Sequence, residues 1–511
     1  MYAVSDAGGS GSVTNSAPPA CITGDPEVRE AVEQTVAATE FGQPNDGAQA
    51  AYQISETLSR TDLTQEQKDE YVAAIVQMAG GQSNFCGSVD ERTAEKLLAG
   101  LNDIGTAWTG PATPELREQV TESISRGVAD GQLDADDLYG IVAEPGAHGT
   151  RQLLTEVRDG NALASVSSRL VSDARAQGYD INDQQTGPET LTAAADIANM
   201  AAANGNRSAA NEVLAEIARV EAGGPVAGDD MTLTEAMMAT TVGGGQWNNL
   251  HERDGFHALS GLLNSVSQTE ANQPAQDALF AGLVRSGGEG YVGGLDEGGN
   301  RGPALDQIGM YFDRNVQRLA EADWRLDNTG DLHHGLMQDF MRGVMLDPDY
   351  GRVEQSQEAL SNEMTRLAVQ IGDESLPGEV RENAASTLGA MMGSLQQAGA
   401  DYIANAKGDA EEKVAFIRQF TDQITDKLIG KLGERLPEGG VSSGATGAAN
   451  NFVDALWQKL VDHEVQAASG HVDETTGGLL DLAQTIRTTM ATGDASLLNA
   501  FDLRVELYYD R

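Results

Sequence analysis

The sequence is poor in aromatic residues, in basic residues and in cysteine, and it lacks long apolar runs. Aromatic side chains make up only 5% of the 511 residues. A core without them must be built from alanine, leucine, valine, isoleucine and methionine. Such side chains favour close helix–helix packing over sandwiches and barrels, whose strands prefer β-branched and aromatic residues. The composition therefore predicts an all-α fold.

Basic residues are scarce beside acidic ones, with 33 Lys and Arg against 78 Asp and Glu and a formal net charge of −45. A negative field repels phosphate backbones and anionic lipid headgroups, so the balance argues against nucleic acid as a partner. The acids are spread along the chain without forming blocks, which is typical of a solvated surface. The alternative is an acidic face for a protein partner of positive charge.

No stretch approaches the roughly 18 consecutive apolar residues that a membrane-spanning helix needs. Residues 1–24 are polar and rich in glycine and serine, a composition typical of a disordered leader. They contain neither the basic region nor the apolar core of a Sec signal peptide. The sequence therefore predicts a protein that is cytoplasmic or exported by a route other than Sec.

The two cysteines are Cys21 and Cys86. Neither lies in a CxxC motif or beside a histidine at metal-ligand spacing, which argues against a zinc site. A disulfide between them would tie the N-terminal arm to the first helical region. In a reducing compartment they would instead be two separate thiols.

Helix starts are clearly encoded. In the segment ATPELREQV, Thr113 can cap a helix, Pro114 lacks the N–H that would go unused, and Glu115 meets the positive helix end. Related starts are predicted at Asp25–Pro26 and Gly187–Pro188. Capping boxes are predicted at Thr64–Gln67 and Ser88–Glu91.

Apolar residues recur at helical spacing, which indicates helices with one buried face. The clearest example is 113–130, where the apolar positions are Leu116, Val120, Ile124 and Val128. Alternation typical of a strand occurs at 501–509, which predicts a short C-terminal strand at most.

Neighbouring helices joined by short polar loops predict a multi-lobed array of helical hairpins, either an irregular solenoid or a bundle. No fixed repeat period is legible. Glycine-rich stretches mark the expected boundaries. The predicted division is a leader at 1–24, an N-terminal helical domain at 25–222, glycine-rich joints with a hairpin at 223–302, a middle helical domain at 303–435, a linker at 436–450 and a C-terminal helical segment at 451–511.

The stretch GGGQWNNLHERDGFH at 243–257 combines metal-compatible side chains, namely His251, Glu252, Asp254 and His257. Zincins use HExxH because positions i and i+4 share one helix face. The two histidines here are six positions apart, so they could converge only across a loop broken at Gly255. The alternative is a helix entrance capped by Asp254, with His257 half-buried on the helix that follows.

A second polar stretch, DWRLDNTGDLHHGLMQDF at 323–340, adds the candidate ligands Asp327, Asp331, His333 and His334. Its DNTGD segment lacks the spacing and the closing glutamate of an EF-hand. The alternative is structural, with Asp331 capping a helix. If both stretches met in space they could hold a divalent metal; otherwise the sequence implies no cofactor.

No GxSxG elbow, P-loop or Rossmann glycine motif is present. The sequence therefore favours a non-catalytic helical module for protein interaction, such as a bacterial secreted effector. One alternative is a metal-assisted hydrolase built on 247–257 and 327–339, and another is a membrane-active helical toxin. Methionine-rich faces at 234–240 and 390–395 could be adaptable binding surfaces or part of the core.

Overall fold

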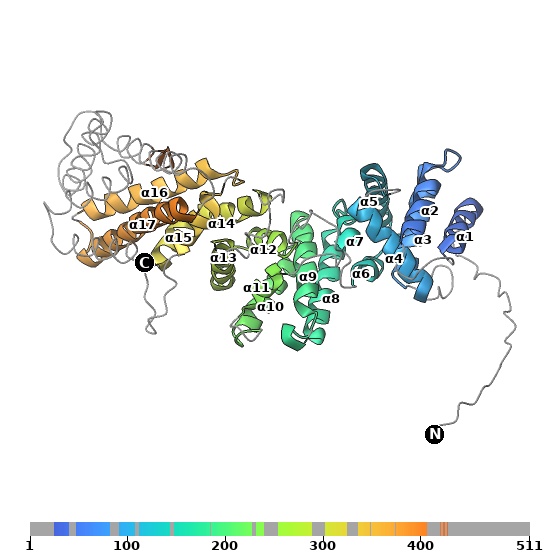
Figure 1. Ribbon diagram of the computed structural model, residues 1–511, viewed down its shortest axis with the longest axis horizontal. Helices are drawn as coiled ribbons and strands as arrows, with labels where there is room; N and C mark the ends of the chain where they lie inside the picture. Colours follow the sequence, from blue (N-terminus) through green and yellow to red (C-terminus); the bar gives the residue numbers. More distant parts are fainter. Residues whose placement is uncertain are drawn as a thin grey trace, which may run out of the picture. The chain divides into compact units, whose positions relative to one another are not determined.

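The computed structural model is all-α among the residues that it describes, with helices joined by turns (Figure 1). This confirms the fold class that the helical periodicity predicts. The segment 501–509 and both cysteines lie outside the described part of the chain. The described residues are 25–39, 47–81, 91–107, 112–143, 148–183, 185–226, 231–239, 254–288, 302–323, 336–347, 349–373, 375–405, 419–420, 423–424 and 427.

The chain divides into two compact units. The division falls inside helix α8 (Gly160–Gln177), whereas the sequence places its first helical boundary at a glycine cluster near residue 222. That cluster lies within unit 2. The division of the sequence into six segments stays a prediction. Unit 1 comprises Met1–Ser172 and Ala203–Asn206, and unit 2 comprises Asp173–Ala202 and Arg207–Arg511.

Helices in unit 1 pack mainly against near neighbours in chain order. Contacts join α1 to α2 and α3, α2 to α4, α3 to α5 and α6, and α4 to α7. Such local packing is typical of stacked helical arrays. The helices are α1 (Pro26–Thr39), α2 (Ala48–Ser59), α3 (Gln65–Ala79), α4 (Glu91–Thr106), α5 (Pro114–Ala129), α6 (Ala135–Val142), α7 (His148–Gln152) and the first part of α8.

The starts of α3 and α5 are formed by the side chains that the sequence indicates. The Thr64 hydroxyl accepts a hydrogen bond from the Gln67 N–H at 3.2 Å, and the Gln67 side chain accepts one from the Thr64 N–H at 2.8 Å. The Thr113 hydroxyl accepts a bond from the Leu116 N–H at 3.2 Å. These bonds satisfy N–H groups that have no partner within the helix, so they fix where the two helices begin.

Helices α4 and α7 touch at Gly105 and Gly149. A Cβ atom on Gly105 would lie 1.7 Å from the carbonyl oxygen of Gly149, and one on Gly149 would lie 1.9 Å from that of Asn102. The Asn102 side chain also accepts a hydrogen bond from the Gly149 N–H at 2.7 Å. Only glycine permits so close an approach of two backbones. This contact holds the start of α7 against α4.

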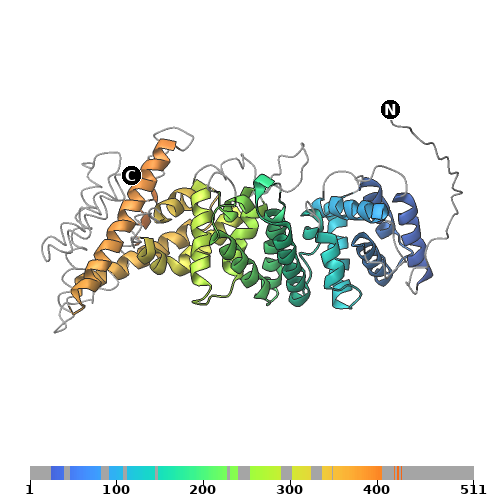
Figure 2. The ribbon, with the colours of Figure 1, turned by 90° about the horizontal axis from the view of Figure 1, so that it is seen from below.

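Unit 2 continues the same packing, with helices side by side in chain order (Figure 2). None of the described helices combines the length and the apolarity needed to cross a bilayer. The helices are α9 (Gly187–Ala203), α10 (Ser208–Glu221), α11 (Leu233–Ala239), α12 (Asp254–Ser265), α13 (Gln273–Gly288), α14 (Gly302–Asp323), α15 (Leu336–Phe340), α16 (Val353–Gly372) and α17 (Gly378–Asn405), with a 3-10 turn at Ile181–Asp183 and a π-helical turn at Met341–Met345.

Aromatic rings gather where α13, α14 and α15 meet. The rings of Phe312 and Phe340 stack with their centroids 3.8 Å apart. Phe280 lies 5.5 Å from Tyr311 and 5.9 Å from Phe340, again between ring centroids. Most of the core around them is aliphatic, so these few rings supply a large share of the local apolar contact area.

The methionine-rich segments 234–240 and 390–395 contribute to the core. The exposed fraction is 0% for Met237, 3% for Met238 and 0% for both Met391 and Met392. Of the two roles that the sequence allows for these methionines, the structure supports packing. Flexible thioether side chains are well suited to fill irregular gaps between helices.

Candidate functional site

Helix α5 presents one apolar face to unit 1 and one charged face to solvent. Its predicted apolar residues are all buried, with exposed fractions of 4% for Leu116, 0% for Val120 and Ile124 and 9% for Val128. The four-residue period that buries them leaves three exposed glutamates on the outside of the helix, Glu115, Glu118 and Glu122.

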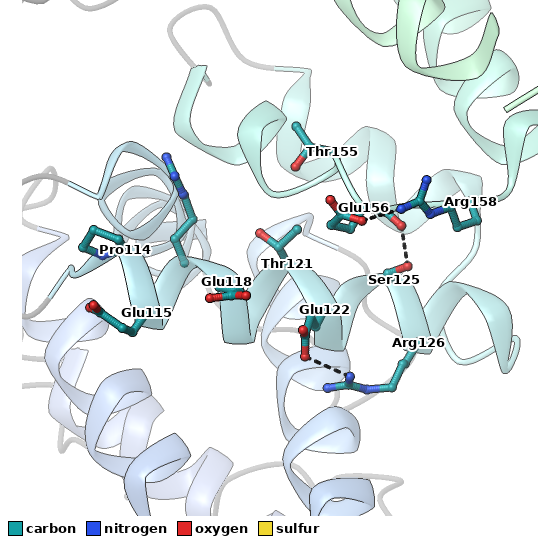
Figure 3. Close-up of a pocket in the computed structure, with 11 residues that line it drawn as sticks. Pro114, Glu115, Glu118, Thr121, Glu122, Ser125, Arg126, Thr155, Glu156 and Arg158 are labelled. Atoms are coloured by element: carbon teal, nitrogen blue, oxygen red, sulfur yellow. Dashed lines mark hydrogen bonds and ion pairs between the residues drawn. The ribbon is translucent and has the colours of Figure 1, made fainter. Parts of the chain in front are cut away.

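An open polar groove of about 730 Å³ lies between α5 and the turn that follows α7. Figure 3 shows α5 crossing below the turn that bears Thr155, Glu156 and Arg158, with Thr121 between the two. We call this cavity the α5 groove. Its lining residues are Pro114, Glu115, Arg117, Glu118, Thr121, Glu122, Ser125, Arg126, Thr155, Glu156 and Arg158.

A buried carboxylate beneath the groove holds α5 in place. Asp69 on α3 accepts hydrogen bonds from Nε of Arg126 at 2.7 Å and from a terminal nitrogen of the same guanidinium at 2.9 Å. The Ser123 hydroxyl adds a third bond at 2.6 Å, and the Gln65 amide a fourth at 2.9 Å. Paired bonds of this kind fix direction as well as distance. Arg126 is therefore bound to Asp69 and forms part of the base of the α5 groove.

The far wall of the groove is joined to α5 by a hydroxyl. The Ser125 Oγ donates to the backbone carbonyl of Glu156 at 2.6 Å. The Glu156 side chain pairs with Arg158 at 2.7 Å. The turn after α7 is thus fixed to the helix, and two of its charges already compensate each other.

The glutamates near the start of α5 are less well compensated. The backbone N–H of Glu115 and the Thr113 hydroxyl lower the pKa of Glu115, so this carboxyl is ionised at neutral pH. Glu122 lies 3.2 Å from Arg126, whose guanidinium is shared with Asp69. Within the described part of the chain, Glu118 has no ion pair.

Thr121 is a polar residue buried in this wall. It is 5% exposed and lines the groove. Among the described residues, no side chain or backbone group forms a hydrogen bond with its hydroxyl. The hydroxyl is not among the groups that are buried without a partner, so it is reached from the open groove. The structure therefore keeps a hydrogen-bonding group available at the centre of the groove.

Charged and hydroxyl side chains line the groove. Neither histidine nor cysteine lines it, and the Ser125 hydroxyl donates to a carbonyl instead of a base. A nucleophile would need such a base beside it. The groove offers carboxylates, guanidinium groups and hydroxyls, of which Arg126 and Ser125 are held by hydrogen bonds.

Glu216 on α10 is a buried acid in unit 2, with a side chain that is 0% exposed. It accepts hydrogen bonds from the Tyr179 hydroxyl at 2.8 Å, from Arg175 at 2.8 Å and from Arg219 at 2.6 Å. Burial raises the pKa of Glu216, but the bonds from Arg219, Tyr179 and Arg175 outweigh it and lower the value to about 2. This carboxylate stays ionised and ties α10 to the last turn of α8.

Of the eight predicted metal ligands, the structure describes Asp254 and His257. Both lie on α12, where Asp254 is the first residue and His257 is half-buried with its ring centroid 6.4 Å from that of Phe256. In the described part of the chain, no group of three or more His, Cys, Asp or Glu residues could hold a metal ion. The others lie outside the described residues, and their grouping stays a prediction; they are His251, Glu252, Asp327, Asp331, His333 and His334.

Gly255 is not the loop break that would let His251 and His257 converge. It lies in the first turn of α12, and a Cβ atom there would be 1.8 Å from the carbonyl oxygen of Met237 on α11. The glycine is required because two helices approach closely. The alternative expectation, a helix entrance followed by a half-buried His257, agrees with the described residues.

The α5 groove is not among the sites that the sequence predicts. Three glutamates at 115, 118 and 122, on the outer face of a clearly predicted helix, were a visible signal. In an acidic chain such a stripe is common and carries little information by itself. The opposite wall, 155–158, reaches α5 only through the tertiary fold.

No protein-family model matches the chain, and no curated protein matches it. Among solved structures it is similar to a crystal complex of SYS-1/POP-1, with 11% sequence identity over 95% of this chain and 89% of that chain. The TM-score of this match is 0.32.

Proposed function

We propose that the chain is a non-catalytic helical scaffold that binds another protein, and that the α5 groove is a docking site. The observation on which this depends is the groove itself. It combines charged side chains with the Thr121 hydroxyl, for which the described residues provide no hydrogen-bond partner. A partner segment could use both.

Two further properties support the proposal. Stacked helices that contact near neighbours create extended surfaces, which helical arrays use to bind other polypeptides. The net charge of −45 would attract a partner of positive charge and speed its encounter at low salt. Both properties favour association over chemistry.

Site-specific photo-crosslinking tests the proposal. A photoreactive amino acid replaces Thr155 in the groove or, as a control, Glu95 on the exposed face of α4 in the same unit. We expect illumination in host cells to give a discrete protein adduct from position 155 and none from position 95. Equal labelling at both positions, or no adduct at position 155, would contradict a docking role for the groove.

The finer form of the proposal is a bacterial protein exported by a route other than Sec. Its support is the polar composition of residues 1–24 and the glycine-rich joints of the sequence. Immunodetection of the chain in culture medium, with a cytosolic marker as the lysis control, tests export. A chain that stays with the cytosolic marker would contradict it.

The alternative of a metal-assisted hydrolase stays a prediction. Elemental analysis of the purified protein distinguishes it from the scaffold. One tightly bound metal equivalent that is lost in His251→Ala or His334→Ala would favour the hydrolase. The scaffold proposal expects no stoichiometric metal, and equal stability of both variants and the natural protein.

A further inference from the structure

The geometry points to a more specific partner: the α5 groove binds an extended polypeptide segment that carries arginine or lysine. One cationic side chain lies between Glu118 and Glu122, and the backbone of the segment bonds to the Thr121 hydroxyl. This inference rests on the proposed function and names the chemistry of the partner at the same site.

The two carboxylates are placed to receive one cation. Glu118 and Glu122 are four positions apart on α5, so their side chains emerge on the same helix face about 6 Å apart at Cβ. Glu118 has no ion pair within the described residues. Glu122 shares Arg126 with Asp69, which makes four hydrogen bonds. A guanidinium from outside would therefore meet under-compensated negative charge.

Thr121 supplies the second contact. It lies between the two glutamates in sequence and is 5% exposed in the groove wall. Its hydroxyl can donate to a backbone carbonyl or accept from a backbone N–H, whichever an extended segment presents. The neighbouring Thr155 hydroxyl already donates to the Gln152 carbonyl at 2.9 Å. Thr121 is the hydroxyl that can bind the segment without giving up a hydrogen bond to a described residue.

An acidic ligand fits the groove less well. Of the three lining arginines, Arg126 is bound to Asp69 and Arg158 is paired with Glu156. Arg117 remains, and it lines the groove together with Glu115 and Glu118. The field of the whole chain, at a net charge of −45, also opposes an anion. A cationic segment is favoured both locally and at long range.

The test uses the full chain and three labelled nine-residue peptides that alternate glycine and serine with three arginines, three citrullines or three glutamates. Citrulline keeps the shape of arginine and removes its charge. Fluorescence anisotropy at low salt measures binding. We expect the arginine peptide to bind at least about tenfold more tightly than the other two. Its affinity should fall as salt screens the charges.

Variants of the full chain locate the binding. The double variant Glu118→Gln/Glu122→Gln should weaken the arginine peptide by about tenfold. The matched control Glu91→Gln/Glu95→Gln removes two exposed glutamates at the same spacing on α4 and should leave the affinity unchanged. Circular dichroism checks that all variants are folded.

Three results would overturn the inference: equal binding of the citrulline peptide, preference for the glutamate peptide, or equal loss of affinity in both double variants. If residue 155 gave a position-specific adduct and any of these results were also obtained, the groove would still be a docking site. The proposal that its partner is a cationic segment would be rejected. Absence of both the adduct and the peptide binding would reject the two proposals together.

Discussion

Arg126 on α5 holds both carboxylate oxygens of Asp69 on α3, with nitrogen–oxygen distances of 2.7 and 2.9 Å. The two residues are 57 positions apart in the sequence. Asp69 is 9% exposed, and Arg126 is the cation that contacts it. The pair fixes the orientation of the helix that provides one wall of the α5 groove.

Removing the guanidinium while keeping its apolar stem should destabilise unit 1. In Arg126→Met, Asp69 stays buried without its cation, and we expect a loss of about 2–3 kcal/mol in the free energy of unfolding. Arg158→Met serves as the control, because the Arg158 side chain is 75% exposed and its ion pair should contribute less than about 0.5 kcal/mol. Urea denaturation followed by circular dichroism measures both. Losses of equal size would show that Asp69 does not need Arg126.

Replacing Thr121 by valine should weaken binding and leave the stability of the fold almost unchanged. The substitution keeps the shape and removes a hydroxyl that lines the open groove and has no hydrogen-bond partner in the described residues, so we expect a change of less than about 0.5 kcal/mol. The arginine peptide should bind several-fold more weakly. Lower affinity at unchanged stability is the signature of a group that serves a ligand.

Thr35→Val provides the comparison. The Thr35 hydroxyl is buried, donates to the Ala31 carbonyl at 3.0 Å and lies 2.8 Å from the Tyr71 hydroxyl. Its loss should destabilise the chain by about 1 kcal/mol or more and leave peptide affinity unchanged. If Thr121→Val were as destabilising as Thr35→Val, the hydroxyl of Thr121 would have a structural role instead.

Glu216 should make unit 2 sensitive to acid. The folded pKa of about 2 lies below the ordinary value of 4.5. Because its folded pKa is lowered, the ionised Glu216 carboxylate stabilises the fold by about 3 kcal/mol above about pH 5. This stabilisation is lost as the pH falls towards 2. Glu216→Gln should lack this acid-dependent part, whereas Glu189→Gln on the exposed side of α9 should keep it. The free energy of unfolding is measured between pH 2 and 6 for the natural protein and both variants. If it changed with pH in the same way in Glu216→Gln and in the natural protein, the role given to Glu216 would be contradicted.

The contact between α4 and α7 should not tolerate a methyl group. Gly149→Ala places a Cβ 1.9 Å from the Asn102 carbonyl oxygen, and backbone must move to relieve the clash. We expect a loss of more than about 2 kcal/mol in thermal or urea unfolding. Gly378→Ala is the control: nothing lies within 4 Å of its Cβ, so the change should be neutral or stabilising by up to about 1 kcal/mol. A neutral Gly149→Ala would mean that α7 is not held as described.

Local features of the sequence predicted much of the fold. The Thr64–Gln67 capping box and the cap at Thr113 depend on residues three positions apart, and both are formed. The apolar stripe that begins at Leu116 is buried as its spacing predicts. These features follow from the geometry of a single helix, so no tertiary information is needed to see them.

The candidate site could not be predicted in the same way. The α5 groove depends on the pairing of Asp69 with Arg126 and on the bond from Ser125 to the Glu156 carbonyl, which join residues 57 and 31 positions apart. Nothing in the spacing of the sequence specifies such pairs. Gly255 shows the same limit, because its role as a contact point depends on Met237 of another helix.

Hydrogen–deuterium exchange of the full chain, with and without the arginine peptide, tests the central claim most directly. We predict slower exchange on binding at the two walls of the α5 groove, residues 114–126 and 153–158, and unchanged exchange in α4. Bound peptide with protection confined to other helices, or with none in these two segments, would contradict the account.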